Sequence, residues 1–184
     1  MPAWIVQFVH SWLCETHTDL HLPGRRPEPF FINVGVPQGS SLSPILFLFF
    51  ASGLLEIELQ GSGAVDASLF SYVDDSYIIV RSKTFDTNCE ALSILHDRAQ
   101  AWATANDVEF APHKYGLLHF QRGNPEKCCK SLPHIQGLTP QHLEAPEGYK
   151  VPHLRILGVI VDSQLKWGPH IDHVRTPSLV CARL

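Results

Sequence analysis

Two adjacent aspartates interrupt an otherwise apolar stretch at residues 69–80, which reads Leu-Phe-Ser-Tyr-Val-Asp-Asp-Ser-Tyr-Ile-Ile-Val. Asp74 and Asp75 lie between two runs rich in β-branched and aromatic residues, a composition typical of strands. Neighbouring side chains on a straight strand point to opposite faces of the sheet, so both carboxylates can face one ligand only at a bend. The pair is therefore either a solvated hairpin turn or a site for something strongly positive.

A divalent cation is the partner that such a pair favours. Two uncompensated carboxylates held close together repel each other, and a cation that prefers oxygen ligands removes that cost. Mg²⁺ is the best match, and Mn²⁺ is a possible substitute.

A second stretch with chemical potential is the Gly/Pro/Ser loop at residues 35–44, which leads into an apolar run. Gly39 lets backbone approach a ligand closely, and the Gln38 side chain offers both a donor and an acceptor. Ser40 and Ser41 can donate hydrogen bonds to a phosphate near a helix N-terminus. A loop that only caps the helix, with no ligand, is the alternative interpretation.

These side chains need a framework of helices and antiparallel strands, which the residue pattern predicts. The expected elements are a helix at residues 4–13, strands on either side of a turn at 21–27 with the second at 29–34, a helix capped by Ser43 and reaching about Glu58, a hairpin at 69–80, a helix from a capping box at Thr87 to Asn106, a strand–turn–strand at 108–120, a loop-rich segment at 121–152 and a strand at 155–162. The fold class is α+β, with helices beside an antiparallel sheet.

Composition and charge limit what the chain can be. Its 184 residues are 45% hydrophobic and 17% charged, which predicts one globular domain. The formal net charge of -4 gives no general attraction to nucleic acid, so any polyanion must be bound through local basic groups or bridging metal ions. The five cysteines form no CxxC pair and no signal-like segment opens the chain, so we expect an intracellular protein with reduced thiols. The apolar run at residues 45–55 is shorter than the roughly 20 residues that span a bilayer, and no membrane association is expected.

Four motifs follow one another along the chain in a recognisable order. They are Val-Pro-Gln-Gly-Ser at residues 36–40, Tyr-Val-Asp-Asp at 72–75, Phe-Ala-Pro-His-Lys at 110–114 and Ile-Leu-Gly-Val at 156–159. The ordered set resembles the palm of reverse transcriptases, in particular those of non-LTR, LINE-like retrotransposons. The resemblance runs over about residues 4–173.

The resemblance implies Mg-dependent, RNA-directed DNA polymerisation. Asp74 would bind the catalytic Mg²⁺ and Asp75 would support it. A primer 3′-hydroxyl would attack the α-phosphate of an incoming dNTP, and pyrophosphate would leave. The implied partners are an RNA template, a DNA primer and a dNTP, and the implied location is the nucleus.

The resemblance also assigns residues outside the carboxylate pair. It places Pro37, Gln38, Gly39 and Ser40 against template or incoming nucleotide, Tyr72 beside the primer end, Lys114 near the triphosphate, and Leu157 with Gly158 in a primer-grip-like position. Each has a plainer alternative, such as a core tyrosine, a solvated turn lysine or an ordinary strand glycine.

The chain departs from the family pattern upstream of the Pro-Gln-Gly loop. The family's reaction uses another aspartate on an earlier palm strand, and Asp19, Glu15 and Glu28 do not follow an apolar strand of that type. We therefore expect residues 1–173 to be a partial palm lacking fingers and thumb, with 174–184 as a truncated tail. This chain alone is expected to be weakly active or inactive.

Two alternatives from other classes stay open. One is a catalytically dead, palm-derived module that binds nucleic acid or assembles with other chains. The other is an unrelated α+β hydrolase using histidine and aspartate, for which no nucleophile is recognisable in the sequence.

Overall fold

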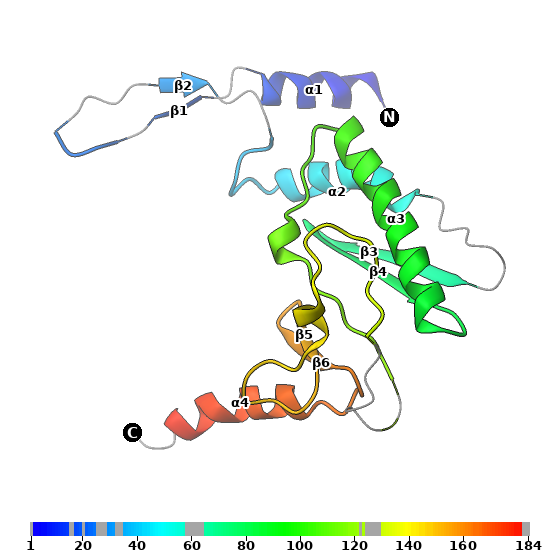
Figure 1. Ribbon diagram of the computed structural model, residues 1–184. Helices are drawn as coiled ribbons and strands as arrows, with labels where there is room; N and C mark the ends of the chain where they lie inside the picture. The colour runs from blue at the N-terminus through cyan, green and yellow to red at the C-terminus, as the bar shows by residue number, and fades with distance from the viewer. Residues whose placement is uncertain are drawn as a thin grey trace. The chain divides into compact units, whose positions relative to one another are not determined.

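The computed structural model describes residues 2–14, 17–19, 21–24, 29–31, 35–57, 65–121, 123 and 130–181, except for the side chains of residues 18, 30 and 176–181. Helices and antiparallel strands alternate along this part of the chain, so the protein is α+β, as predicted (Figure 1). The chain divides into two compact units, Met1–Gly53 and Leu54–Leu184.

The described strands form three separate two-stranded antiparallel sheets, where the sequence predicts one palm-like sheet. The α-helices in the described residues are α1 (Ala3–Leu13), α2 (Ser43–Leu55), α3 (Phe85–Ala105) and α4 (Gly168–Cys181). The three strand pairs are β1 (His17–Asp19) with β2 (Pro29–Phe31), β3 (Asp66–Tyr72) with β4 (Asp75–Arg81), and β5 (His153–Ile156) with β6 (Val159–Asp162). Among the described residues, no helix is both long enough and apolar enough to cross a membrane.

The first unit holds α1, the β1–β2 pair and the start of α2. The predicted first helix and the predicted strand beginning at Pro29 are both confirmed, while residues 32–34 of that strand lie outside the described residues. The helix α2 stops at Leu55, before the predicted end at about Glu58, because the Ile57 N–H bonds to the Leu54 carbonyl in a tight turn. Glu58 itself lies outside the described residues.

The β3–β4 hairpin has two unlike faces. Residues directly opposite one another share a face, so Leu69 and Ile78 lie on one side while Phe70 and Tyr77 lie on the other. The first side is half-buried, and the helix α3 packs against β4. The second side carries Asp75, and most of its large side chains are exposed.

The helix α3 begins one turn earlier than predicted. Thr84 has extended backbone and its side chain accepts the Thr87 N–H at 3.2 Å, so Thr84 is the N-cap and Thr87 lies inside the first turn. The capping box predicted at Thr87 is therefore wrong, because the threonine three residues earlier takes the cap position. The predicted end at Asn106 is confirmed by its C-cap position.

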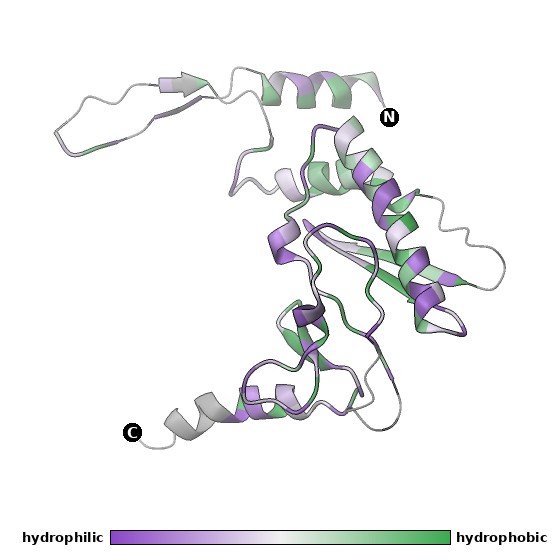
Figure 2. Ribbon diagram, viewed as in Figure 1, coloured by the Kyte–Doolittle hydropathy of each residue, from purple (hydrophilic) through white to green (hydrophobic). Residues whose placement is uncertain are grey.

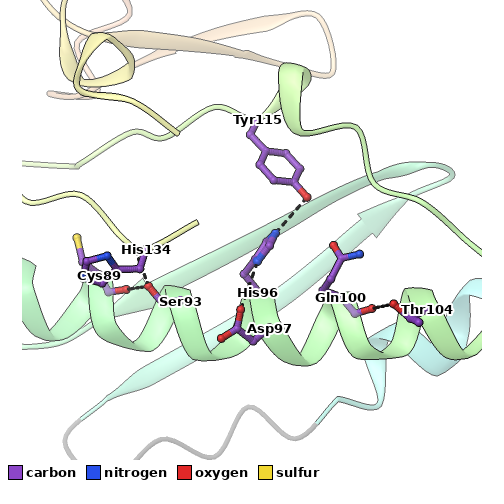
Figure 3. Close-up of polar contacts among 8 residues, drawn as sticks. All are labelled: Cys89, Ser93, His96, Asp97, Gln100, Thr104, Tyr115 and His134. Atoms are coloured by element: carbon purple, nitrogen blue, oxygen red, sulfur yellow. Dashed lines mark hydrogen bonds and ion pairs between the residues drawn. The ribbon is translucent and has the colours of Figure 1, made fainter. Parts of the chain in front are cut away.

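Polar contacts along α3 hold two later segments of the chain (Figure 3). The His96 Nε2 lies 3.1 Å from the Tyr115 hydroxyl, and the two rings meet edge to face. The Ser93 hydroxyl accepts the His134 N–H at 2.9 Å. Apolar and polar residues alternate along α3, whereas α2 is apolar along nearly its whole length (Figure 2). The polar side of α3 thus anchors chain that has little regular structure of its own.

The strand–turn–strand predicted at residues 108–120 is wrong. These residues lack ladder partners, and the 3₁₀ helix η1 (Pro112–Lys114) replaces the predicted turn. Single contacts hold the segment instead. A Cβ on Gly116 would come within 2.8 Å of the Leu154 side chain, so a larger residue there would require that side chain on β5 to shift.

The strand predicted at residues 155–162 is instead a hairpin. Leu157 and Gly158 both have positive φ, 47° and 87°, the pattern of the type I′ turns that join two-residue hairpins. The sequence hid this turn because leucine is not a usual turn residue and the flanking residues are apolar on both sides. The helix α4 packs against β6 and continues to Cys181, into the segment expected to be a truncated tail.

Candidate functional site

The tip of the β3–β4 hairpin places the two aspartates at a tight reversal. Tyr72 pairs with Asp75 across the ladder, which leaves Val73 and Asp74 as a two-residue loop. Val73 has φ of 54°, and a β-branched residue in the left-handed region is a genuine outlier. The Ser71 hydroxyl braces the turn by donating to the Val73 carbonyl at 3.2 Å. Backbone strain of this kind clusters at functional sites, so the tip is the first candidate.

Both carboxylates at this tip act on one hydroxyl, that of Tyr77. The Tyr77 hydroxyl lies 3.4 Å from the Asp75 Oδ2, because residues i and i+2 of a strand project from the same face. Burial raises the pKa of Tyr77 above its ordinary value, the charge of Asp75 and its hydrogen bond raise it further, and the charge of Asp74 adds a smaller effect. The two carboxylates are therefore exposed, adjacent and within electrostatic reach of the same group.

The backbone of a second turn, between β5 and β6, also affects the pKa of Tyr77. A backbone hydrogen bond with Leu157 acts on the Tyr77 phenol and lowers its pKa, against the larger effects above. Among the predicted site residues of the second unit, the structure places Asp74 and Asp75 next to each other at the hairpin tip. Sequence reasoning missed Tyr77, although its position two residues after Asp75 on a predicted strand was the available signal.

The Pro-Gln-Gly loop folds back on the start of α2. The Ser43 hydroxyl donates to the Pro37 carbonyl at 2.5 Å, and the Ser40 hydroxyl accepts the Leu42 N–H at 3.2 Å. Ser43 is the first residue of α2, and its hydroxyl donates across the loop, so the prediction that it caps the helix is wrong. Gly39 has φ of 84°, with open space where a side chain would be. The loop therefore presents bare backbone next to Gln38.

The predicted site residues fall into both compact units. Those in the first unit are Pro37, Gln38, Gly39 and Ser40, and those in the second are Tyr72, Asp74, Asp75, Lys114, Leu157 and Gly158. A joint role for the two sets stays a prediction.

Lys114 lies at the end of η1 and is exposed. In the described part of the chain it forms no ion pair with Asp74 or Asp75. Its turn is held from the side by Gly137, which has φ of 97° and where a Cβ would come within 2.7 Å of the Pro112 carbonyl oxygen. The predicted triphosphate role of Lys114 stays a prediction.

The residues at the hairpin tip fit part of a divalent-metal site. Among the described residues, no group of three or more His, Cys, Asp and Glu side chains is arranged to hold a metal ion. Mg²⁺, however, is commonly bound by one or two carboxylates, with water and substrate phosphates completing its shell. Asp74 and Asp75 supply two such carboxylates on an exposed turn.

A buried aspartate elsewhere has a structural role. Asp162 is 1% exposed, and its carboxylate accepts the backbone N–H groups of Gln164, Lys166 and Trp167 at 2.9, 3.2 and 2.6 Å. All three bonds lie in the loop between β6 and α4. Asp162 therefore fixes the entry to α4 and is not a free ligand.

The group formed by His119, Ser131 and Asp86 is not a hydrolase triad. The His119 Nε2 lies 2.8 Å from the Ser131 carbonyl oxygen, while the Ser131 hydroxyl donates to the Asp86 Oδ1. The imidazole therefore does not contact the hydroxyl that it would have to activate. The hydrolase alternative finds no support in these contacts.

Comparison with known proteins gives a consistent result. The profile of the family described as "Reverse transcriptase (RNA-dependent DNA polymerase)" matches residues 2–161. The "RNA-directed DNA polymerase from mobile element jockey" of Drosophila melanogaster is 26% identical over 175 residues, which cover 95% of this chain and 18% of that protein. The protein of the same name from Drosophila funebris is 28% identical over 153 residues, which cover 83% of this chain and 16% of that protein. No solved structure matches.

Proposed function

The chain belongs to the reverse transcriptase (RNA-dependent DNA polymerase) family, and from that premise we propose that it supplies the carboxylate hairpin of a non-LTR mobile element's RNA-directed DNA polymerase. The observation that carries the proposal is the strained tip of the β3–β4 hairpin, where Asp74 and Asp75 are adjacent and exposed. The chain spans less than a fifth of the curated relatives it matches, 18% and 16% of their lengths. The polymerase as a whole therefore needs parts that this chain does not supply.

In the proposed reaction Asp74 is the metal ligand at the tip and Asp75 supports it from the first position of β4. Bound Mg²⁺ would neutralise charge on the attacking and leaving oxygens during nucleotidyl transfer from a dNTP to a primer 3′-hydroxyl. The chain's own task is to hold the two carboxylates in fixed directions at an exposed edge. The strained turn serves that task, because a rigid reversal leaves the carboxylates little freedom.

The remaining predicted residues take positions that suit nucleic-acid contacts. The bare backbone at Gly39 and the amide of Gln38 suit the template or the incoming nucleotide. The exposed ring of Tyr72 suits the primer end, and the ammonium of Lys114 suits a triphosphate. The turn at Leu157 and Gly158 would meet the primer strand. The RNA template, the DNA primer and action in the nucleus belong to the same proposal.

We further propose that this chain alone is weakly active or inactive. The described residues supply two clustered carboxylates and no third. A metal held by fewer protein ligands is oriented less firmly, and catalysis by such sites depends on preorganised charge. A catalytically dead palm-derived module that binds nucleic acid or assembles with other chains is the alternative.

Primer extension tests the proposal. Purified chain would be incubated with poly(rA)/oligo(dT), dTTP and Mg²⁺, beside the Asp74→Ala variant. The expected result is trace or no extension by the intact chain, and none by Asp74→Ala. Extension that survives Asp74→Ala would overturn the site assignment, and vigorous extension by the intact chain that Asp74→Ala abolishes would overturn the proposed inactivity.

A further inference from the structure

The outer edge of β4 has no strand beside it in the described part of the chain. The strand spans seven residues, Asp75–Arg81, and pairs with β3 along its whole length without a bulge. Alternate residues of an antiparallel strand direct their N–H and C=O groups away from the partner strand. Among the described residues, no backbone hydrogen bond joins β4 to any segment other than β3. A row of open donors and acceptors of this kind can pair with a further strand.

The sequence of β4 lacks the features that usually protect an edge strand. Natural edges are blocked by proline, by bulges or by charged side chains within the strand. The charges of β4 lie only at its two ends, Asp75 and Arg81, and the residues between them are Ser-Tyr-Ile-Ile-Val. Ile79 is 50% exposed, although it lies near the middle of the strand. The edge is therefore apolar in its centre and charged at its ends.

The two end charges of β4 have opposite signs, and this makes the edge complementary to itself. If two copies of β4 pair antiparallel about Ile78, each Asp75 lies opposite Arg81 of the second copy, and each Tyr77 lies opposite Ile79 of the second copy. Two-fold symmetry makes both pairs occur twice. Opposite-charge pairs and aromatic–β-branched pairs are both stabilising across antiparallel strands. The four residues lie on one face of the hairpin, so all the pairs form on the same side.

The strand β3 offers no such match. Antiparallel pairing of two copies of β3 about Leu69 would place Asp66 opposite Tyr72, with no opposite charge at either end. Asp66 already pairs with Arg81 within one chain at 3.0 Å, and both side chains are largely exposed, 66% and 84%. An exposed ion pair of this kind contributes little, and the five N–H donors of the guanidinium can serve a second carboxylate. The charge pattern therefore favours β4.

We propose that the β4 edge is a self-association surface, on which a second copy of this chain pairs antiparallel through its own β4. The contact joins the two β3–β4 hairpins into one four-stranded sheet, in the order β3, β4, β4 and β3. The inference goes beyond the proposed function and depends neither on metal binding nor on polymerase activity.

Sedimentation equilibrium of the purified full chain tests the proposal. The chain would be run between about 1 and 100 μM, because a contact between two strands is small and such interfaces associate weakly. The weight-average mass should rise from that of one chain toward that of two. A folded parent chain that stays monomeric throughout this range would overturn the proposal, whatever the variants do, and would leave the β4 edge to a strand from a different polypeptide.

Two matched substitutions test where the copies meet. Ile79→Lys places an ammonium group on the proposed edge, while Phe70→Lys makes a similar change on the same face of β3, away from that edge. Ile79 and Phe70 are 50% and 54% exposed, so both variants should fold, which circular dichroism checks. We expect Ile79→Lys to weaken self-association about tenfold or more, and Phe70→Lys to leave it within about twofold of the parent value. An equal loss in both variants would overturn the edge contact, because it would indicate association through the apolar face of the whole hairpin.

Charge exchange tests the register. Asp75→Arg or Arg81→Asp alone places like charges opposite each other when two identical copies pair, which should weaken self-association about tenfold. An equimolar mixture of the two variants restores an opposite-charge pair at each end, so the mixture should associate as the parent chain does. A mixture that stays monomeric, while the parent chain dimerises and both variants are folded, would overturn the antiparallel register about Ile78.

Discussion

The chain contains two hairpins with loops of the same length but opposite turn chemistry. At the β5–β6 tip the left-handed positions are held by Leu157 and Gly158, and glycine adopts such backbone without strain. At the β3–β4 tip the left-handed position is held by Val73, a residue that strongly disfavours it. The first turn has glycine at one of its two left-handed positions, and the second has a β-branched residue at its left-handed position.

This difference shows where the chain tolerates backbone strain. Strained residues of this type cost about 1–3 kcal/mol each and persist only where the surrounding structure enforces them. At the β3–β4 tip the enforcing groups are the seven paired residues of each strand and the Ser71 hydroxyl. The strain falls next to Asp74, which is the residue that the proposed function needs most.

The largest expected effect comes from placing a β-branched residue in the β5–β6 turn. Gly158→Val places a β-branched residue at φ of 87° and should lower the free energy of unfolding by about 3 kcal/mol. Urea denaturation followed by circular dichroism measures it. Gly168→Ala is the control, because Gly168 has open space where a Cβ would lie. Equal free energies of unfolding for Gly158→Val and the parent chain would contradict this comparison of the two turns.

The converse change relaxes the strained turn. Val73→Gly should raise the free energy of unfolding by about 1 kcal/mol, because relief of the left-handed strain exceeds the added chain entropy of glycine. The same variant should bind Mn²⁺ more weakly than the parent, since Asp74 gains freedom. Urea denaturation measures the first effect, and Mn²⁺ titration followed by the electron paramagnetic resonance signal of free Mn²⁺ measures the second. A destabilised Val73→Gly chain would remove the basis of the comparison.

A smaller change in stability is expected from a substitution at Leu157 in the β5–β6 turn. Leu157→Asn should raise the free energy of unfolding by about 0.5 kcal/mol, because asparagine tolerates left-handed backbone and Asn-Gly favours a type I′ turn. The substitution leaves Asp74 and Asp75 unchanged, so Mn²⁺ affinity should stay at the parent value. A lower free energy of unfolding in Leu157→Asn would contradict the type I′ assignment of this turn.

The smallest effect is seen in titration. Burial raises the pKa of Tyr115, and burial together with the Asp75 charge raises the pKa of Tyr77, both above 10.0. A raised folded-state pKa means that the folded chain holds the proton more tightly, so the associated stability is complete below about pH 10 and is lost as pH rises through the folded-state value. Carbon-13 NMR of labelled tyrosine measures both titrations. Asp75→Asn should lower the pKa of Tyr77 and leave that of Tyr115 unchanged.

The sequence predicted the parts of the fold that rest on local patterns. The period of Trp4, Phe8 and Trp12 gives α1, and the apolar runs around Asp74 and Asp75 give the β3–β4 hairpin. Capping was less predictable, because Thr84 and Thr87 are equally good caps and only backbone geometry chooses between them. Strands at residues 108–120 were predicted from side-chain character, but a strand also requires a partner in register.

The candidate site was predictable where it lies in one motif and hidden where it depends on distant contacts. Asp74, Asp75 and the Pro-Gln-Gly loop are visible as motifs. The turn at Leu157 and Gly158 was hidden, because the sequence presents it as the middle of a strand. Pairing between segments far apart in the chain is set by packing, which residue patterns do not encode.

Gly137 affects the location of Lys114, the side chain proposed to contact the triphosphate. The segment from residue 130 to residue 152 contains little regular structure beyond the 3₁₀ helix η3 (Pro140–Leu143), the kind of loop in which length changes are usually harmless. Gly137, however, abuts Pro112 so closely that no other residue fits. Lys114 therefore takes its location from a glycine in a different stretch of chain, and an insertion or deletion just before residue 137 would move the lysine without touching its own turn.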